Sequence, residues 1–442
     1  MNGNELGGAL SGRIIRPGDE EWDAARRFHS GVGEPAVVVR ASSVAEVIAA
    51  VRLAATEGLA VLVRGGGHSA WGEVGGGMTI DLSALDDIDV TGDTVRIGGG
   101  ATWGAVAAAL APHGLGISSG DTASVGVGGL TLGGGIGWMV RAWGLAADQL
   151  VGAQLVTAAG VVVEVTDDTE PELMWALRGG GGNFGVVTRF DFRAHPLPRV
   201  VFATFALEGD ARPALRALRD LLRTAPRALT VTYMDVPPMD PSAPAGATIT
   251  ACWVGDDEDA ARAALAPLLD VEGVALADLG VRAYPDILLD APAADPDQPM
   301  PGFVGGNTLA RELDDDLIDR LAAFREHNEV SVLFLRSLGG AYADVPADAT
   351  AFAGRDATWF AMAGAFDIPG LLPVAQRAAA VRDWADIERR SGGGVYGNFT
   401  TSTDASWPAR MYPAPTLARL ATVKRQWDPQ NLFSRNHNVA PG

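Results

Sequence analysis

The sequence predicts an α+β protein with more than one domain. Its 442 residues exceed the usual size of a single hydrophobic core. Residues 33–199 combine short β-branched runs with glycine clusters, whereas residues 200–395 alternate strands with Ala/Leu/Arg-rich helices. The second pattern is typical of an antiparallel sheet with helices covering one face. We therefore expect an N-terminal arm over 1–32, two domains over 33–199 and 200–395, and a C-terminal segment over 396–442.

In the first domain, Ser43 and Glu46 have the S-x-x-E spacing of a capping box. This spacing predicts a helix to about residue 56, with Gly58 as its stop. Further helices are expected at 102–110 and 171–177. The β-branched runs between turn signals predict strands at 36–40, 62–64, 78–82, 94–97, 152–157, 161–165 and 186–194.

In the second domain, the expected helices cover 211–224, 257–269, 315–327 and 372–390. The expected strands cover 201–206, 229–234, 247–254, 331–338 and 357–363. Residues 290–301 are rich in Pro, Asp and Ala and predict a long loop of the kind that forms a pocket rim. A last helix is expected at about 414–427.

Charge and cysteine content exclude several classes of partner. Lys and Arg number 34 against 54 Asp and Glu, a net charge of −20, which repels nucleic-acid phosphates and anionic lipids. We therefore expect no nucleic-acid and no membrane partner. The one cysteine, Cys252, cannot form an intramolecular disulfide, which fits a reducing, cytoplasmic location. No heptad or apolar stripe indicates an oligomeric state.

Glycine accounts for 56 of the residues, about twice the average share. Three glycine-rich stretches lie at 64–69, 126–137 and 179–185. Such turns direct backbone N–H groups at anions, and three together favour a large cofactor with a pyrophosphate. For each stretch alone, the alternative of tight turns and bulges is favoured. The GxGxxG at 180–185 is not a Rossmann fingerprint, because a helical pattern precedes it and a strand follows.

His68 lies inside the first glycine turn, directly after a strand. A lone histidine is usually structural, but small neighbours leave the ring nitrogens of this one accessible to chemistry. The six histidines show no metal-ligand spacing, so no metal is expected.

The glycine motifs and the C-terminus together carry a resemblance to a known family. The motifs are RGGGHSAWG at 64–72, SVGVGGLTLGGGIGWMVRAWGLAADQL at 124–150, RGGGGNFGVVT at 178–188, YGNF at 396–399 and WDPQNLFSRNHNVAP at 427–441. In this order and spacing, the chain resembles the berberine bridge enzyme-like branch of the vanillyl-alcohol oxidase and p-cresol methylhydroxylase flavoproteins. Bacterial oxidases, including those of antibiotic pathways, are the members that it resembles most. The resemblance is weakest over 200–395.

The resemblance implies an FAD-binding domain of the p-cresol methylhydroxylase type, with two α+β subdomains over 33–199. A substrate domain with a helix-covered antiparallel sheet would follow, and residues 396–442 would return to the FAD-binding domain. His68 matches the position that bonds covalently to the flavin 8α carbon. The cofactor-binding positions that the motifs imply are Arg64, Gly65, Gly66, Gly67, His68, Ser69, Val125, Gly126, Gly129, Gly133, Gly134, Gly137, Asp148, Asn183, Gly185, Val187, Tyr396, Asn398, Asn436 and Asn438.

Three positions depart from the family pattern or depend on it. Thr122 stands where many relatives carry a cysteine that forms a second flavin link, so the expected link is a single histidyl one without a cysteinyl partner. Val125 matches a position associated with oxygen access, and the alternative is a packed strand residue. Phe334 stands where relatives often have an acidic residue, which puts the alcohol-oxidation mechanism of the family in doubt.

The expected function is oxidation of a small organic substrate by FAD, with dioxygen as acceptor and peroxide as product, in secondary metabolism or catabolism. The family's Y-x-N pattern makes Tyr396 and Asn398 the candidates for proton transfer or substrate orientation. Tyr342 is a weaker candidate, for which a structural role is favoured. A flavin-dependent oxygenase and a non-catalytic flavin- or ligand-binding protein are the alternatives.

Aromatic side chains hint at a flat or hydrophobic molecule, although most of them are expected in the core. They are Trp71, Trp138, Tyr233, Phe303 and Trp359.

Overall fold

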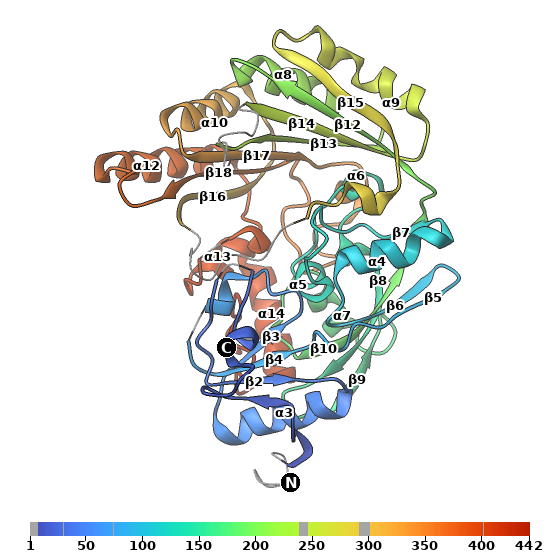
Figure 1. The fold of residues 1–442 in the computed structure, drawn as a ribbon, viewed down its shortest axis with the longest axis vertical. Helices are drawn as coiled ribbons and strands as arrows, with labels where there is room; N and C mark the ends of the chain where they lie inside the picture. The colour runs from blue at the N-terminus through green and yellow to red at the C-terminus, as the bar shows by residue number, and fades with distance from the viewer. Residues whose placement is uncertain (1–7, 30, 74, 238–245, 291–300, 401) are drawn as a thin grey trace.

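The computed structural model describes residues 8–442 except 30, 74, 238–245, 291–300 and 401. Within these residues, three larger sheets are stacked along the long axis of the molecule (Figure 1). A short ladder joins β7 (Leu115–Gly116) to β11 (His195–Pro196).

Most of the predicted rim loop 290–301 lies outside the described residues. None of the described helices has the length and apolar character that a membrane-crossing helix requires.

The first sheet has the order β1-β2-β4-β3. Its strands are β1 (Ile14–Ile15), β2 (Val37–Arg40), β4 (Met78–Asp81) and β3 (Val61–Arg64), of which the last three run parallel. Helix α3 (Val44–Glu57) packs its apolar side on this sheet. Ser43 accepts a hydrogen bond from the Glu46 N–H, as predicted, and Gly58 ends the helix with φ 66°. The Glu46 carboxylate, however, accepts from the Ser42 N–H and not from that of Ser43.

The second sheet is antiparallel, with the order β5-β6-β10-β8-β9. Its strands are β5 (Ile88–Thr91), β6 (Thr94–Gly98), β10 (Val186–Arg193), β8 (Leu150–Val156) and β9 (Val162–Val165). Helices α4 (Trp103–Leu110) and α7 (Pro171–Leu177) contribute to its core. Because α7 precedes the glycine run at 179–185 and β10 follows it, the rejection of a Rossmann motif is confirmed.

The third sheet is antiparallel, with the order β15-β12-β14-β13-β17-β18-β16. Its strands are β15 (Val274–Arg282), β12 (Val200–Leu207), β14 (Ala247–Val254), β13 (Leu229–Asp235), β17 (Ser331–Ser337), β18 (Trp359–Asp367) and β16 (Gly302–Ala310). One face carries α8 (Ala211–Leu222), α9 (Glu258–Leu265), α10 (Asp315–His327) and α12 (Val374–Ser391) (Figure 1). The prediction of a helix-covered antiparallel sheet is confirmed.

The two edge strands β15 and β16 were not predicted. Strand β15 is mostly exposed or half-buried, so it lacks a strong apolar pattern. Strand β16 contains Gly305 and Gly306, and glycine is depleted in strands. A Cβ on Gly306 would lie 2.6 Å from Trp384 Nε1 of α12. The glycine therefore lets this helix pack closely on the sheet.

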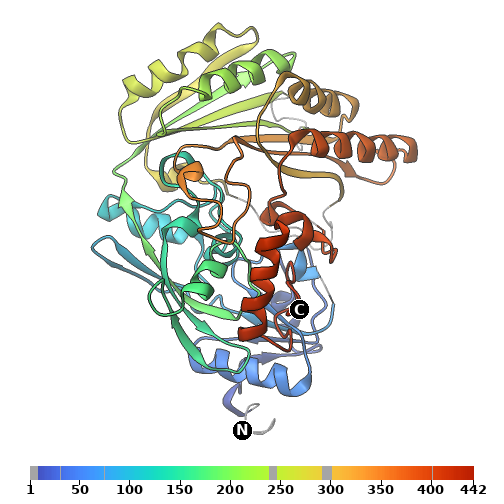
Figure 2. The ribbon, with the colours of Figure 1, turned by 180° about the vertical axis from the view of Figure 1, so that it is seen from behind.

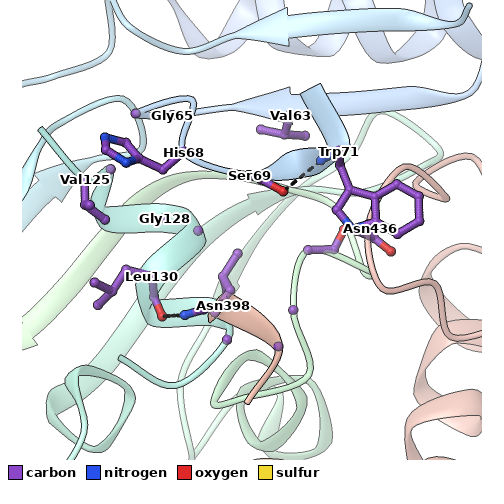
Figure 3. Close-up of a pocket in the computed structure, with 18 of the residues that line it drawn as sticks. Val63, Gly65, His68, Ser69, Trp71, Val125, Gly128, Leu130, Asn398 and Asn436 are labelled. Carbon is purple, nitrogen blue, oxygen red and sulfur yellow. Dashed lines mark hydrogen bonds between the residues drawn. The ribbon is translucent and has the colours of Figure 1, made fainter. Parts of the chain in front are cut away.

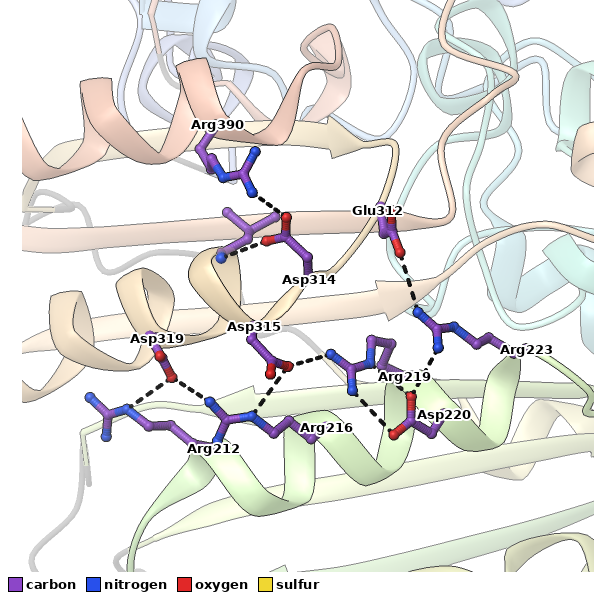
Figure 4. A network of polar contacts seen from close by, with 11 residues as sticks. Arg212, Arg216, Arg219, Asp220, Arg223, Glu312, Asp314, Asp315, Asp319 and Arg390 are labelled. Atoms are coloured by element: carbon purple, nitrogen blue, oxygen red, sulfur yellow. Dashed lines mark hydrogen bonds and ion pairs between the residues drawn. The ribbon is translucent and has the colours of Figure 1, made fainter.

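Arginine–carboxylate contacts join the exposed sides of α8, α10 and α12 (Figure 4). Arg216 donates to Asp319 over 2.7 Å, and Arg219 also pairs with Asp315. Arg390 of α12 pairs with Asp314, which caps α10. Exposed pairs of this kind each contribute about 0–1 kcal/mol, so the apolar core beneath them supplies most of the packing energy.

The C-terminal residues lie against the two N-terminal sheets (Figure 2). They include α13 (Trp407–Met411) and α14 (Ala414–Trp427), whose Leu420 and Val423 join the core of the second sheet. The shorter described helices are α2 (Trp22–Ala25), α5 (Val127–Leu132), α6 (Val140–Trp143), α11 (Ala341–Asp344), η1 (Ala70–Glu73), η2 (Ala111–His113), η3 (Ala146–Gln149), η4 (Ala266–Asp270), η5 (Tyr284–Ile287) and η6 (Gly397–Phe399).

Candidate functional site

A cavity of about 440 Å³ lies where the three glycine-rich stretches meet the C-terminal residues. Its volume is in the range of cofactor and ligand pockets. Figure 3 shows His68 and Val125 on one side of the pocket and Trp71 with Asn436 on the other. The predicted residues that line it are Arg64, Gly65, Gly66, Gly67, His68, Ser69, Val125, Gly126, Gly129, Gly133, Gly185, Val187, Tyr396, Asn398 and Asn436.

The glycines of the pocket serve two different purposes. A Cβ on Gly66 would lie 2.3 Å from the Gly126 nitrogen, so these two residues allow two backbones to pack together. A Cβ on Gly129 would meet nothing within 4 Å, and one on Gly182 would only touch Asn436 at 4.0 Å. These two positions therefore leave open space at the pocket wall, as a bound ligand requires.

His68 is held between two side chains. Its Nε2 lies 3.0 Å from the Ser124 hydroxyl, and its ring stacks on His29 at a centroid distance of 4.0 Å. Burial, and next the neighbouring His29, lower the pKa of His68 to about 4. The imidazole is therefore neutral at pH 7 and keeps a lone pair available for bond formation.

Arg64 lines the pocket, but its guanidinium group binds residues outside the pocket lining. Its Nη1 donates to the Ala25 and Arg27 carbonyls, and its Nη2 donates to Asp81 over 2.6 Å. The guanidinium carbon also lies 5.2 Å from the centre of the Phe28 ring. Arg64 thus ties the N-terminal arm to the glycine turn, a role that the sequence did not predict.

Tyr396 lies at the pocket with its hydroxyl oxygen surrounded by donors. The Gly135 N–H donates to this oxygen over 3.0 Å, the Ile136 N–H over 3.2 Å and the Asn398 amide over 2.9 Å. Burial raises the pKa of Tyr396, while these three bonds oppose the rise. The phenol keeps its proton at neutral pH, and its oxygen would be stabilised as an anion if that proton were transferred.

Asp121 is a pocket residue that the sequence analysis missed. Its carboxylate accepts from Arg336 Nη2 over 2.8 Å and from the Thr122 hydroxyl over 3.1 Å. Arg336 is almost fully buried and also donates to Thr232. No local sequence signal identifies Asp121, because its partner Arg336 is 215 residues away along the chain.

The face of the third sheet opposite its helices adjoins the pocket through Phe399. This side chain lines the pocket and packs on Phe334 and Phe360, with ring centres 6.1 Å and 4.9 Å away. The aromatic residues that the sequence suggested for the substrate site lie in different places. Trp71 lines the pocket and Phe303 packs near Phe334, while Tyr233 and Trp359 belong to the helix-side core and Trp138 lies against Arg336.

Several predicted site residues are not brought to this pocket. Tyr342 is fully buried and donates to the Gly354 carbonyl over 2.6 Å, so it packs in the core away from the pocket lining. Asp148 pairs with Arg355 and accepts from the Leu145 N–H. A Cβ on Gly134 would clash with the Phe352 ring, and a Cβ on Gly137 would clash with the Ser119 carbonyl oxygen, so close packing requires glycine at both positions.

Two predicted asparagines also lie outside the pocket lining. Asn183 donates to the Gly180 and His437 carbonyls and accepts from the Val439 N–H, which fixes the C-terminal residues. Asn438 is likewise absent from the lining. Asn183 thus supports the pocket by holding the C-terminal residues in place.

Three polar atoms test whether the pocket fits a large polar cofactor. Trp71 Nε1, Asn436 Oδ1 and His437 Nδ1 are buried without a hydrogen-bond partner among the described residues. All three residues line the pocket. A buried polar atom without a partner costs about 1–3 kcal/mol. A ligand with donors and acceptors would satisfy them, and with the open glycine positions they fit a dinucleotide such as FAD. The described residues hold no cluster of three or more His, Cys, Asp or Glu suited to a metal ion.

Comparisons with known proteins agree with this pocket. The model of the family described as FAD binding domain matches residues 35–166, and that described as berberine and berberine like matches residues 395–440. Fold and pocket thus define an FAD-linked oxidoreductase. The chain carries both of these domains, and its relatives include FAD-linked oxidases and oxidoreductases, so the predicted resemblance, fold class and enzyme class are confirmed.

Several relatives match along nearly the whole chain. (R)-6-hydroxynicotine oxidase of Paenarthrobacter nicotinovorans is 29% identical over 98% of this chain and 97% of its own. An FAD-linked oxidoreductase of Dictyostelium discoideum is 27% identical over 99% and 96%. The crystal structure of 6-hydroxy-D-nicotine oxidase from Arthrobacter nicotinovorans is 28% identical, with a TM-score of 0.80 over 97% of this chain and 98% of that one. A chitooligosaccharide oxidase shares the fold, with a TM-score of 0.85 at 24% identity.

Proposed function

We propose that this protein is an oxidase with FAD linked covalently and only through His68, and that it oxidises a small organic substrate in secondary metabolism or catabolism. The observation that carries the proposal is a neutral imidazole presented at the pocket by a glycine turn. Bound FAD supplies the acceptor for a hydride from a substrate C–H bond, and dioxygen takes up the two electrons as peroxide.

The residue at position 122, where many relatives carry a cysteine that forms a second flavin link, supports a single link. Thr122 lines the pocket and cannot form a thioether. The one cysteine, Cys252, is fully buried in β14, and burial raises the pKa of its thiol. A buried thiol of this kind is not nucleophilic.

We assign the proton chemistry to Tyr396, with Asn398 as its positioning residue. The Tyr396 hydroxyl can donate to a substrate heteroatom, because its own oxygen already accepts from Gly135, Ile136 and Asn398. Asp121 supplies a carboxylate at the same pocket, and Phe334, which stands at the family's acidic position, lies behind Phe399 and has none. Arg336 pairs with that carboxylate and fixes its position, so Asp121 is a second candidate for the proton acceptor.

We also propose that different segments of the chain bind the cofactor and the substrate. Residues 33–199 and 396–442 hold the cofactor, and residues 200–395 supply the outer wall of the substrate site. The side chains of the third sheet that adjoin the pocket through Phe399 are mainly aromatic or thioether groups, which suits a flat, partly apolar substrate. They include Met234, Phe303, Phe334, Phe360 and Met362. The single buried cysteine supports a cytoplasmic location.

The proposal is tested by denaturing the purified protein in acid and separating the pellet. A yellow, fluorescent pellet is expected from the wild-type protein, and a colourless pellet with free FAD in the supernatant from His68→Ala. Peroxide release in a screen of alcohols, amines and aromatic compounds would identify the substrate class. A colourless wild-type pellet would refute the covalent link, while peroxide release would still test the oxidase activity.

A flavin-dependent oxygenase is the second candidate. It is supported by Phe334 in place of a carboxylate and by 41% identity to the FAD-dependent monooxygenase FUP4 of Fusarium proliferatum, over 41% of this chain and 35% of that protein. Turnover under ¹⁸O₂ separates the two activities, because only the oxygenase incorporates the label into its product. Flavin that no screened substrate bleaches without air would instead favour a binding protein.

A further inference from the structure

The ring of His29 lies flat on the ring of His68. The ring centres are 4.0 Å apart and the planes differ by 17°. His29 belongs to the N-terminal arm, far from the glycine motif in sequence, and it is half-buried. The contact therefore brings a second imidazole to the residue on which the proposed flavin link depends.

The arm that carries His29 is anchored to the turn that carries His68. The His29 N–H donates to the Gly67 carbonyl over 2.9 Å. Arg64 donates to the Ala25 carbonyl over 2.6 Å, and a Cβ on Gly72 would lie 2.3 Å from the Phe28 ring. Backbone bonds, an arginine and a glycine contact thus fix the arm, so the stacking is a built feature of the fold.

The stacking leaves His68 with restricted freedom. The Ser124 hydroxyl engages Nε2 at one edge of the ring, and His29 covers a face. Burial lowers the pKa of His29 as well as that of His68, so two neutral rings can stack at neutral pH without charge repulsion. Holding a nucleophile in its reactive orientation can accelerate bond formation by orders of magnitude.

We propose that His29 is a positioning residue for flavin attachment, whose flat ring holds the His68 imidazole in the orientation that bonds to the flavin. This inference rests on the proposed covalent link. In the attachment step, a bond forms between a ring nitrogen of His68 and the 8α carbon, while one 8α C–H bond and the imidazole N–H bond break. The two electrons and two protons go to the flavin ring system, and dioxygen takes them up as peroxide, which restores the oxidised flavin.

The test follows attachment in protein that is purified free of flavin from flavin-depleted cells and then incubated with excess FAD in air. Aliquots are denatured in acid, and covalent flavin is measured by absorbance of the pellet and by the mass of the peptide that contains His68. We expect His29→Ala to slow attachment about tenfold or more, and His29→Phe, which keeps a flat ring, to restore it. His29→Asn, which lacks a ring, should resemble His29→Ala and serves if the alanine variant does not fold.

His195 provides a matched control. It is also half-buried and also stacks on an aromatic ring, that of Trp143, at 4.6 Å and 16°. It does not line the pocket. His195→Ala should therefore leave attachment at the wild-type rate.

The outcomes separate this inference from the proposed function. A wild-type protein without covalent flavin would refute the link itself. Covalent flavin in the wild type with an unchanged rate in His29→Ala and His29→Asn would overturn the role of His29. Equal slowing in His29→Ala and His29→Phe would overturn the role of the flat ring.

Discussion

Arg336 donates a hydrogen bond to Asp121 over 2.8 Å, with the two side chains 3% and 18% exposed. The pair joins β17 of the outer sheet to the loop that lines the pocket before Thr122. Thr232 accepts from the same guanidinium, and Trp138 lies 4.6 Å from it. The third sheet and the pocket lining are therefore connected by a largely buried ion pair.

Replacing Arg336 tests the energetic importance of that pair. Arg336→Met leaves the Asp121 carboxylate without its cation, and we expect the free energy of unfolding to fall by about 3 kcal/mol. Urea denaturation measures it. Arg216→Met is the control, because its exposed pairs with Asp315 and Asp319 should contribute less than about 1 kcal/mol. Equal losses in the two variants would contradict the assignment.

Tyr396→Phe tests the proposed proton chemistry. It removes the oxygen that accepts from Gly135 and Ile136 and the proton offered to the substrate. With a substrate from the peroxide screen, the rate of anaerobic flavin bleaching should fall about a hundredfold at unchanged flavin content. Tyr342→Phe removes a buried hydroxyl away from the pocket, so its bleaching rate should match the wild type. A wild-type rate in Tyr396→Phe would exclude this tyrosine from the chemistry.

Replacing Lys424 tests whether the C-terminal residues stabilise the pocket. Its fully buried ammonium donates to Asp428, to the Asn183 carbonyl and to the Phe433 carbonyl. Lys424→Met leaves Asp428 buried and uncompensated, so we expect a loss of about 3 kcal/mol or more in stability. Because Asn183 and Phe433 precede pocket residues, flavin content after purification should fall as well. Thermal unfolding and flavin absorbance measure the two effects, and unchanged values would contradict this role.

The half-buried His195 predicts how the stability of the fold changes with pH. Burial, and next Arg193, lower the pKa of His195 below 6.5, so this ring stays neutral in the fold while the unfolded chain binds a proton. Stability therefore rises with pH through the region just below 6.5 and is lost as the pH falls. His195→Gln should lose less stability than the wild type between pH 7 and pH 5, measured by urea denaturation. An identical loss would show that this ring does not contribute.

The sequence could predict the features that have a local pattern. The capping of α3 at Ser43 and the strands of the first two sheets other than β1 and β5 follow from adjacent residues, whereas the pocket position of Tyr396 followed from the family resemblance. A glycine run indicates close approach without identifying the neighbour. For this reason Gly129 was placed at the pocket correctly, whereas Gly137 packs against the Ser119 carbonyl.

Features that depend on distant residues could not be predicted. Asp121 meets Arg336, and His29 meets His68, only because the chain folds back over long distances. Neither Asp121 nor His29 lies in a motif that would identify it beforehand. Tyr342 was considered because of its glycine turn, but its hydroxyl is bonded inside the core.

The most direct test of the central claim is the mass of the proteolytic peptide that contains His68, taken from acid-denatured wild-type protein. Our account predicts that this peptide carries the mass of one flavin and its fluorescence, and that the peptide containing Thr122 is unmodified. An unmodified His68 peptide with all the FAD free in solution would contradict it.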